Sequence, residues 1–130
     1  MNEKELVLKA IDVKKNSYSP YSEFSVGAAL LTDDGEIFTG VNVENVSFGL
    51  TNCAERTAFF KAISEGKRKF SAIAVAGGDT YLPPCGACRQ VMAEFCDKDF
   101  KVIFVKNENE YITKSLEEIL PFSFSGEDMK

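Results

Sequence analysis

The sequence predicts a single α/β domain, a three-layer α/β/α sandwich around one mixed five-stranded sheet. Segments with the spacing of amphipathic helices alternate with short apolar segments of strand length along the whole chain. The chain has 130 residues, of which 45% are hydrophobic and 27% are charged, as expected for one globular domain with its own core. No repeat, low-complexity tract or linker divides the sequence, so we expect residues 1–130 to form one domain.

The first half of the chain is predicted to form a helix followed by a β-hairpin. Residues 2–16 carry apolar side chains at helical spacing among lysines and glutamates, and residues 17–22 form a loop that contains a proline. Two strand-like segments, 24–31 and 36–43, flank the turn sequence Asp33-Asp34-Gly35. These two strands are therefore expected to be antiparallel neighbours.

The second half of the chain is predicted to alternate helices with strands. After a polar and aromatic loop at 45–52, the expected elements are a helix at 53–65 stopped by Gly66, a strand at 70–76, a helix at 85–96, a strand at 101–105, a small strand near Tyr111, and a short helix at 115–120 that Pro121 ends. Strands that are joined by crossover helices run parallel, so the sheet is expected to be mixed.

The charge and the residue types exclude several classes of function. The chain has 15 lysines and arginines, 20 aspartates and glutamates, a formal net charge of −5, and no histidine. An acidic chain gains nothing from counterion release on a phosphate backbone, so we expect no nucleic-acid partner. Without histidine there is no Ser-His or Cys-His nucleophile and no histidine base or metal ligand. A metal site or a proton-transfer site must then use Cys, Asp, Glu, Lys or Tyr.

The sequence shows no feature of a membrane protein or a secreted protein. No segment approaches the roughly 20 apolar residues of a membrane span, and the N-terminal residues lack the pattern of a signal peptide. We therefore expect a cytoplasmic protein with no membrane partner. In that compartment, the four cysteines indicate metal binding or reactive thiols more than disulfides.

Three of the cysteines and one glutamate form two short clusters, Cys53-Ala54-Glu55 and Cys85-Gly86-Ala87-Cys88. A strand that follows a helix returns the chain to the same edge of the sheet, so both clusters are expected at helix N-termini that face each other. The positive end of each helix dipole stabilises thiolates there. Two cysteines at this spacing also occur in redox proteins, but a redox function leaves Cys53 beside Glu55 unexplained.

The two clusters together predict one catalytic zinc ion per chain. Three thiolates around Zn²⁺ leave a fourth position open for water, which is the pattern of a catalytic site. A carboxylate at Glu55 also favours helix capping, but its place beside a predicted zinc ligand indicates a general acid and base. Cys96 lies eight residues beyond Cys88 on the same predicted helix. That spacing puts it about 12 Å along the helix axis, too far to share the ion, so Cys96 is expected to be a packed thiol.

The clusters match the signature of zinc deaminases, in which a glutamate follows the first ligand by two residues and a Pro-Cys-x-x-Cys segment comes later. Further stretches carry the resemblance: Ser19-Pro20-Tyr21-Ser22, Asn42-Val43-Glu44-Asn45, Asn52 to Ala58, and Pro84 to Gln90. With the ending from Leu120 to Met129, nearly the whole chain resembles the short, all-cysteine, homotetrameric cytidine deaminases. The resemblance implies the fold of that family and the hydrolytic deamination of cytidine and deoxycytidine to uridine and deoxyuridine plus ammonia, in pyrimidine salvage.

The resemblance implies a role for each residue of the two clusters. Cys53, Cys85 and Cys88 hold the zinc ion. Glu55 takes a proton from water and passes it to N3 of the pyrimidine and then to the leaving ammonia. The backbone N–H of Ala54 faces the oxygen of the base.

The resemblance also implies which residues bind the substrate. Asn42 and Glu44, with Val43 between them, bind the ribose, and side chains two apart on a strand share a face. Phe24 flanks the ligand. The alternatives are that Phe24 is only a core residue and that Glu44 is only a solvated charge at the end of a strand. Phe124 matches an aromatic residue that stacks on the base in the site of a neighbouring subunit, which implies a homotetramer with shared active sites.

Two further residues are expected to act on the zinc ligands. Three thiolates and Zn²⁺ carry a net charge of −1, which makes bound water less acidic, and a guanidinium that donates to sulfur withdraws part of that charge. Arg56 is predicted to do this, the alternative being a solvated surface cation, and Gln90 is predicted to act similarly. Phe48 departs from the resemblance, because many members of the family have a tyrosine there and its hydroxyl is missing here.

Two alternatives to a cytidine deaminase remain at this point. An aminonucleoside-antibiotic deaminase of the blasticidin type shares the three-cysteine site, but the segment Asn42-Val43-Glu44-Asn45 argues against it. A non-catalytic zinc-stabilised module or an inactive binding protein would not need Glu55. Deaminases of polynucleotides, tRNA and nucleotides usually have histidine as their first ligand, so the expected substrate is a small nucleoside.

Overall fold

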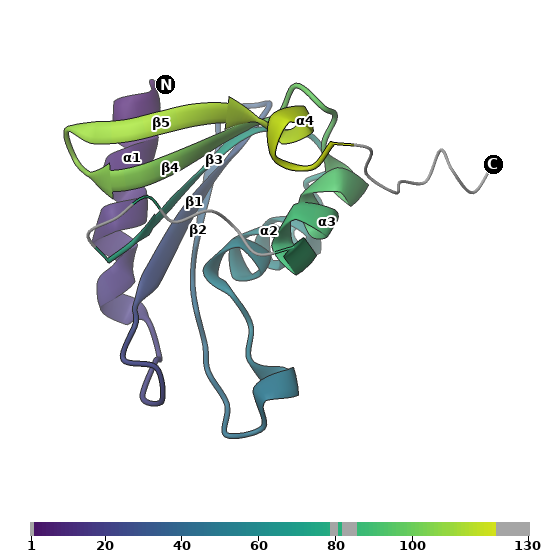
Figure 1. Ribbon diagram of the computed structural model, residues 1–130. Coiled ribbons are helices and arrows are strands. Elements are labelled where there is room, and N and C mark those ends of the chain that lie inside the picture. Colours follow the sequence, from purple (N-terminus) through teal and green to yellow (C-terminus); the bar gives the residue numbers. More distant parts are fainter. Residues whose placement is uncertain (1, 79–80, 82–85, 122–130) are drawn as a thin grey trace.

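The computed structural model describes residues 2–78, 81 and 86–121 (Figure 1). Its elements, in chain order, are α1 Glu3–Val13, the 3₁₀ turn η1 Lys14–Asn16, β1 Val26–Thr32, β2 Ile37–Val41, the 3₁₀ turn η2 Phe48–Leu50, α2 Ala54–Ser64, β3 Phe70–Gly77, α3 Gly86–Phe95, β4 Lys101–Asn107, β5 Glu110–Ser115 and α4 Leu116–Ile119. Every helix and strand that the sequence predicts is present. Among the described residues, no helix is long and apolar enough to cross a membrane.

The five strands form one mixed sheet in the order β2-β1-β3-β4-β5. Strand β1 is antiparallel to both β2 and β3, while β3 and β4 are parallel, and β5 is antiparallel to β4. The predicted hairpin of β1 and β2 and the parallel crossover from β3 to β4 are therefore confirmed. Because β2 and β3 are both antiparallel to β1, they run in the same direction, and the helices that follow them begin at the same edge of the sheet.

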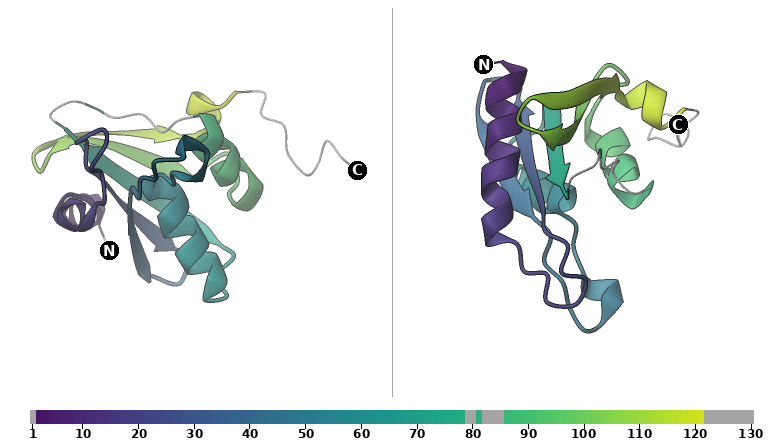
Figure 2. Two further views of the ribbon diagram at one scale, coloured as in Figure 1. Left: turned by 90° about the horizontal axis from the view of Figure 1, so that it is seen from below. Right: turned by 60° about the vertical axis from the view of Figure 1, so that its left-hand side comes forward.

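Helices cover both faces of the sheet, which confirms the three-layer architecture (Figure 2). Helix α1 lies alone on one face, where Leu6, Val7 and Ala10 pack against small residues such as Ala29 and Ala74. Helices α2 and α3 lie on the other face and enclose the larger core cluster. The central strands β1 and β3 are buried on both sides, which is why their sequences are continuous apolar runs and not alternating ones.

The ends of several elements differ from the predicted ones for local reasons. The last helix begins at Leu116 because Ser115 is its N-cap: the Ser115 hydroxyl accepts from the Glu118 backbone N–H, and the Glu118 carboxylate accepts from the Ser115 backbone N–H. Helix α2 ends before Gly66, whose φ of +93° is the left-handed conformation that stops a helix, as predicted. The predicted loop at 45–52 contains the η2 turn.

Phe59 of α2 is the centre of the larger core cluster. It is fully buried, and its ring lies 5.2 Å from that of Phe70 in an edge-to-face arrangement and 6.1 Å from that of Phe100. Phe70 begins β3 and Phe100 immediately precedes β4, so one side chain joins α2 to the starts of two parallel strands. Edge-to-face aromatic pairs add to the free energy gained by burial alone.

We expect Phe59→Ala to lower the free energy of unfolding by about 3–5 kcal/mol, because it leaves a cavity between α2 and the sheet. Phe60 is the matched control, since it is the next residue on α2 but has 47% of its surface exposed. Phe60→Ala should cost less than about 1 kcal/mol. Urea denaturation of both variants measures the difference, and equal losses would contradict the central role of Phe59.

Candidate active site

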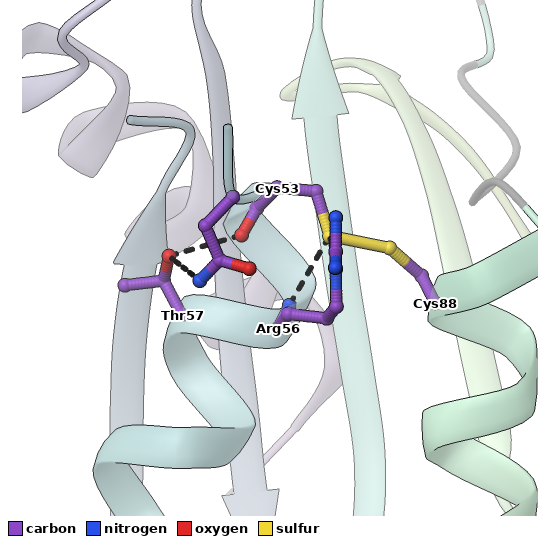
Figure 3. Close-up of a disulfide and its surroundings, with 5 residues drawn as sticks. Cys53, Arg56, Thr57 and Cys88 are labelled. Atoms are coloured by element: carbon purple, nitrogen blue, oxygen red, sulfur yellow. Dashed lines mark hydrogen bonds between the residues drawn. A yellow bond between two sulfur atoms is a disulfide. The ribbon is translucent and has the colours of Figure 1, made fainter. Parts of the chain in front are cut away.

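Cys53 lies at the start of α2, where its sulfur accepts two hydrogen bonds. It is the N-cap residue, and its Sγ accepts from the backbone N–H of Arg56 at 3.4 Å and from the Arg56 Nε at 3.2 Å (Figure 3). A cationic donor and the positive end of the helix dipole both stabilise a thiolate at this position. The sequence analysis predicted that the Arg56 guanidinium donates to a cysteine sulfur, and the structure shows that this sulfur is the one of Cys53.

Cys88 of α3 faces Cys53 of α2, and the structure joins the two as a disulfide, a pairing that the sequence analysis did not predict (Figure 3). Their Cα atoms are 7.6 Å apart. Disulfide-bonded cysteines usually have Cα atoms about 4.4–6.8 Å apart, so this spacing suits two thiolates that share one ion better than a covalent bond. Only the reduced pair can bind a metal, because the thiolate is the ligand.

The ligand atoms of Cys53, Glu55 and Cys88 all lie within 4.8 Å of one another. Two sulfurs and a carboxylate that converge in this way fit a zinc ion, which prefers thiolate ligands and binds them at about 2.3 Å. The third predicted zinc ligand, Cys85, lies outside the described residues. Glycine at position 40 of β2 allows this arrangement, because a Cβ there would collide with the backbone of Ala54 and Ala58 in the first turns of α2.

Glu55 is the only charged side chain among the described residues that is nearly fully buried, with 5% of its surface exposed. Burial raises the pKa of the Glu55 carboxyl above its usual value, and the opposing effects of its own backbone N–H and of the Arg56 charge are smaller. A carboxyl group of raised pKa beside a metal site is suited to accept and donate a proton near neutral pH.

Asn42 follows β2 and is buried, and its side chain is held by hydrogen bonds to residues before and at the start of β1. Its Oδ1 accepts from the Val26 backbone N–H at 2.9 Å and from the Ser17 hydroxyl, while its Nδ2 donates to the Phe24 carbonyl at 2.8 Å. Because these bonds fix which end of the amide is the oxygen, one amide N–H remains to be offered to a ligand. The Asn42 backbone N–H still donates to the Val26 carbonyl at 3.4 Å, but the Val26 N–H donates to the Asn42 side chain and not to its carbonyl, so the backbone pairing of β2 does not continue fully past Val41.

Glu44 lies against the loop that contains Tyr21 and Ser22. Its Oε1 accepts from the backbone N–H groups of Tyr21 at 3.0 Å and Ser22 at 3.1 Å, and its Oε2 accepts from the Ser22 hydroxyl. These bonds, led by that of the Ser22 hydroxyl, hold the pKa of Glu44 below its usual value, so the carboxylate stays ionised. Glu44 also lines a hollow of about 380 Å³ with Tyr21, Ser22, Asn45, Phe48 and Thr51.

The remaining predicted site residues lie on several elements. Val43 is half-exposed between Asn42 and Glu44, and Ala54 is the fully buried first residue of α2. Phe24 is 40% exposed, with its ring against Gly78 at the end of β3. Gln90 lies on α3 two residues after Cys88, and Phe124 lies outside the described residues.

Cys96 lies just after α3, apart from the other cysteines. It is partly buried against the larger core cluster, and burial raises the pKa of its thiol far above the ordinary value. A buried thiol of high pKa is poorly nucleophilic and binds metal weakly, as the sequence analysis expected for a packed cysteine.

The sequence analysis missed the residues that hold the functional side chains in place. Ser17 was predicted only as a loop residue, and Ser22 was part of a matching stretch but had no assigned role, yet their hydroxyls bond to Asn42 and Glu44. Thr57 was part of a matching stretch but had no assigned role, and its hydroxyl donates to the carbonyl of Cys53. A serine or threonine near a functional residue is too common a pattern to identify such a contact from sequence.

Comparison with known families agrees with this geometry. The model of a family described as the cytidine and deoxycytidylate deaminase zinc-binding region matches residues 1–105. Among curated relatives, the chain is 52% identical over 131 residues to a cytidine deaminase of Halalkalibacterium halodurans, covering 99% of this chain and 98% of the relative. It is also 52% identical over 135 residues to a probable cytidine deaminase of Dictyostelium discoideum, covering 99% of this chain and 90% of the relative.

Solved structures show the same likeness. A cytidine deaminase from Burkholderia pseudomallei superposes with a TM-score of 0.91 at 45% identity, over 95% of this chain and all of the other. The cytidine deaminase from Mycobacterium tuberculosis superposes with a TM-score of 0.85 at 38% identity, over 95% of this chain and 98% of the other. The fold, the spacing of the cysteines and the buried glutamate thus occur together in a chain similar to these proteins along its whole length.

We expect Cys88→Ser to lower the zinc content of the purified protein by at least about tenfold, because it removes one of the two sulfurs that converge there among the described residues. Cys96→Ser is the matched control, and it should keep about the zinc content of the unmodified protein. Elemental analysis after gel filtration measures both. Zinc that stays undiminished in Cys88→Ser would show that the metal is held elsewhere.

Proposed function

The chain belongs to the cytidine deaminase family of zinc-dependent hydrolases, and we propose that it converts cytidine and deoxycytidine to uridine and deoxyuridine with release of ammonia, in pyrimidine salvage. The observation that carries this proposal is the buried Glu55, whose carboxylate lies within 4.8 Å of the facing sulfurs of Cys53 and Cys88. A structural zinc site would need the sulfurs but would gain nothing from an acid buried beside them.

Cys53 and Cys88 are proposed to hold one zinc ion together with Cys85. When bound, zinc acts as a Lewis acid that makes water nucleophilic near neutral pH. The protein supplies thiolates at two helix N-termini, and the guanidinium of Arg56 draws negative charge away from the sulfur of Cys53. Helix α3 carries Gln90 as well, for which we propose a similar, weaker effect on the ligands.

Glu55 is proposed to move the protons of the reaction. Hydrolytic deamination adds water at C4 of the pyrimidine and expels the amino group as ammonia, so one proton must reach N3 and another the leaving nitrogen. A carboxyl of raised pKa can take a proton from water, deliver it to N3, and return a second to the amino group. The backbone N–H groups in the first turn of α2 have no acceptor within the helix. The backbone N–H of Ala54 is proposed to donate to the oxygen of the base.

The sugar is proposed to bind at the segment from Asn42 to Glu44. Asn42 has an amide N–H left after its three internal bonds, and the Glu44 carboxylate is ionised and partly exposed, so both suit ribose hydroxyls. Phe24 stands next to this segment through the bond from Asn42 to its carbonyl, and its half-exposed ring suits a contact with the nucleoside. Both features favour a nucleoside with an intact ribose over an antibiotic of the blasticidin type.

We propose that the enzyme is a homotetramer in which neighbouring chains share active sites. The loop after Val43 exposes large apolar side chains, with Val46 at 75%, Phe48 at 80% and Leu50 at 70% of their surface exposed. Exposed apolar groups at this density indicate a surface that another chain covers. In such an assembly Phe124 would reach a neighbour's site.

We propose that the protein is cytoplasmic. Thiolate ligands require a reducing compartment, which fits the cytoplasm.

The direct test is ammonia release from cytidine, deoxycytidine, cytosine and dCMP, with blasticidin assayed beside them. We expect release from the two nucleosides and little from the free base or the nucleotide. Release from none of them by zinc-loaded protein would favour a binding module, and release from blasticidin alone would favour the antibiotic deaminase.

We expect Glu55→Gln to lower turnover by at least the ~10²–10⁴-fold typical of losing a general acid and base. The amide keeps the size and hydrogen bonding of the carboxyl but cannot accept the proton. Zinc content by elemental analysis and nucleoside affinity by calorimetry should both be retained. Loss of zinc would instead make Glu55 a structural ligand.

Glu44→Gln is the contrasting variant, because it makes the same replacement of a carboxylate by an amide at a second acidic residue. It removes a charged partner of a ribose hydroxyl, worth roughly 1.5–3 kcal/mol, so affinity should weaken about 10- to 150-fold while zinc stays bound. Equal effects of the two variants on turnover and on affinity would contradict the separate roles of the two glutamates.

We expect Phe48→Asp to dissociate the tetramer, because it buries a charge in the proposed interface. Light scattering at assay concentration should show a smaller species, and activity should fall with it. Leu8→Asp on α1, where the side chain is 42% exposed, is the control and should stay assembled. A Phe48→Asp protein that is fully active as a monomer would rule out shared sites.

A further inference from the structure

We propose that Thr57 is a positioning residue that couples the sugar-binding segment to the metal-binding Cys53. The inference rests on the proposed function, since it assigns to Thr57 the task of holding two parts of that site in register. Thr57 lies on the second turn of α2, half-buried, and no part of the proposed chemistry uses it directly.

Cys53 is held at both its sulfur and its carbonyl. While Arg56 donates to the Sγ, the carbonyl oxygen of Cys53 accepts two bonds from Thr57, one from the backbone N–H and one from the hydroxyl, each of 3.0 Å (Figure 3). The backbone bond is the ordinary first bond of a helix. The hydroxyl bond is additional, and it fixes the peptide of the residue whose sulfur is proposed to bind zinc.

The hydroxyl of Thr57 also accepts a hydrogen bond, from the Nδ2 of Asn52 at 3.1 Å. One hydroxyl therefore bridges the side chain of Asn52 and the carbonyl of Cys53. A threonine is stiff about χ1, because its branched Cβ restricts the rotamers available in a helix. The bridge is thus a rigid one.

Asn52 is in turn paired with the sugar-binding segment through its backbone. Its N–H donates to the Val43 carbonyl and its carbonyl accepts from the Val43 N–H, both at 2.9 Å. Val43 lies between Asn42 and Glu44, the two proposed ribose ligands. A continuous path of hydrogen bonds therefore leads from the sugar-binding segment through Asn52 and Thr57 to Cys53.

This path sets the distance between the metal site and the sugar contacts. When the ribose is held at one end, that distance decides where the reacting carbon of the base lies, and a displacement of about 1 Å can cost on the order of 10²-fold in rate. Asn42 and Glu44 have their own bonds to Val26, Phe24, Tyr21 and Ser22, so loss of the Thr57 hydroxyl should leave sugar binding largely intact.

The test compares Thr57→Val, which keeps the shape but removes the hydroxyl, with Thr57→Ser, which keeps the hydroxyl. Ser64→Ala is the matched control, because it removes a hydroxyl-to-carbonyl bond, from Ser64 to Lys61 at 2.8 Å, at the far end of the same helix. Zinc affinity is measured by competition with a chromogenic chelator, and kcat and KM for cytidine are measured per bound zinc.

We expect Thr57→Val to lower zinc affinity and kcat about tenfold each, with KM within about threefold of the unmodified protein. Thr57→Ser and Ser64→Ala should stay within about threefold on all three quantities. Thr57→Val that lowers only the melting temperature, with zinc affinity and kcat unchanged, would overturn the inference. A Thr57→Ser protein as impaired as Thr57→Val would overturn it as well.

Asn52→Ala provides a second measurement if Thr57→Val does not fold. It removes the amide donor but keeps the backbone pairing with Val43, so it should lower zinc affinity in the same direction, and the double variant should lose less than the sum. Unchanged zinc affinity in Asn52→Ala would overturn the path.

The measurements also separate the inference from the proposed function. Chelator competition does not require the protein to be active. A protein that fails to deaminate cytidine would refute the proposed function, while its zinc affinities would still decide the role of Thr57.

Discussion

The convergence of two helix N-termini at one edge of the sheet is the constraint on which the site depends. Helices α2 and α3 follow strands β2 and β3, which run in the same direction because both are antiparallel to β1. Cys53 and Cys88, at the starts of these helices, therefore meet although they are 35 residues apart in sequence. The same geometry directs two positive helix ends at the sulfurs, which stabilises the thiolates that a zinc ion needs.

The absence of histidine gives this site its particular electrostatics. A site built from thiolates holds more negative charge than one built from imidazoles, and the charge must be offset if water is to be activated. The Nε of Arg56 lies 3.2 Å from the sulfur of Cys53 and supplies that offset from the same turn of helix. Glu55, one residue earlier, lies buried, and desolvation raises the pKa of its carboxyl, which suits the proton transfers proposed for it.

Positioning in this protein is done largely by short polar side chains at loop and helix ends. The loop before β1 holds Asn42 through Ser17 and Glu44 through Tyr21 and Ser22, and Val26 at the start of β1 also donates to Asn42. Thr57 joins Asn52 to Cys53. These groups have few rotatable bonds, so ordering them costs little conformational entropy. The groups proposed to bind the sugar and the metal are thereby fixed before a ligand arrives, which is the condition for catalysis by orientation.

The sequence by itself predicted the sheet and its helices, and it indicated the cysteines and the glutamate for which we propose the zinc chemistry, because periodicity and motif spacing are local signals. Tertiary structure decided which polar atoms meet across the fold: that the Asn42 amide bonds to Val26 and Phe24, and that the Glu44 carboxylate bonds to Tyr21 and Ser22. These contacts join separate segments of the chain, and their spacing in sequence carries no period. A carboxylate or amide finds its partner only once the fold brings both segments within hydrogen-bond distance.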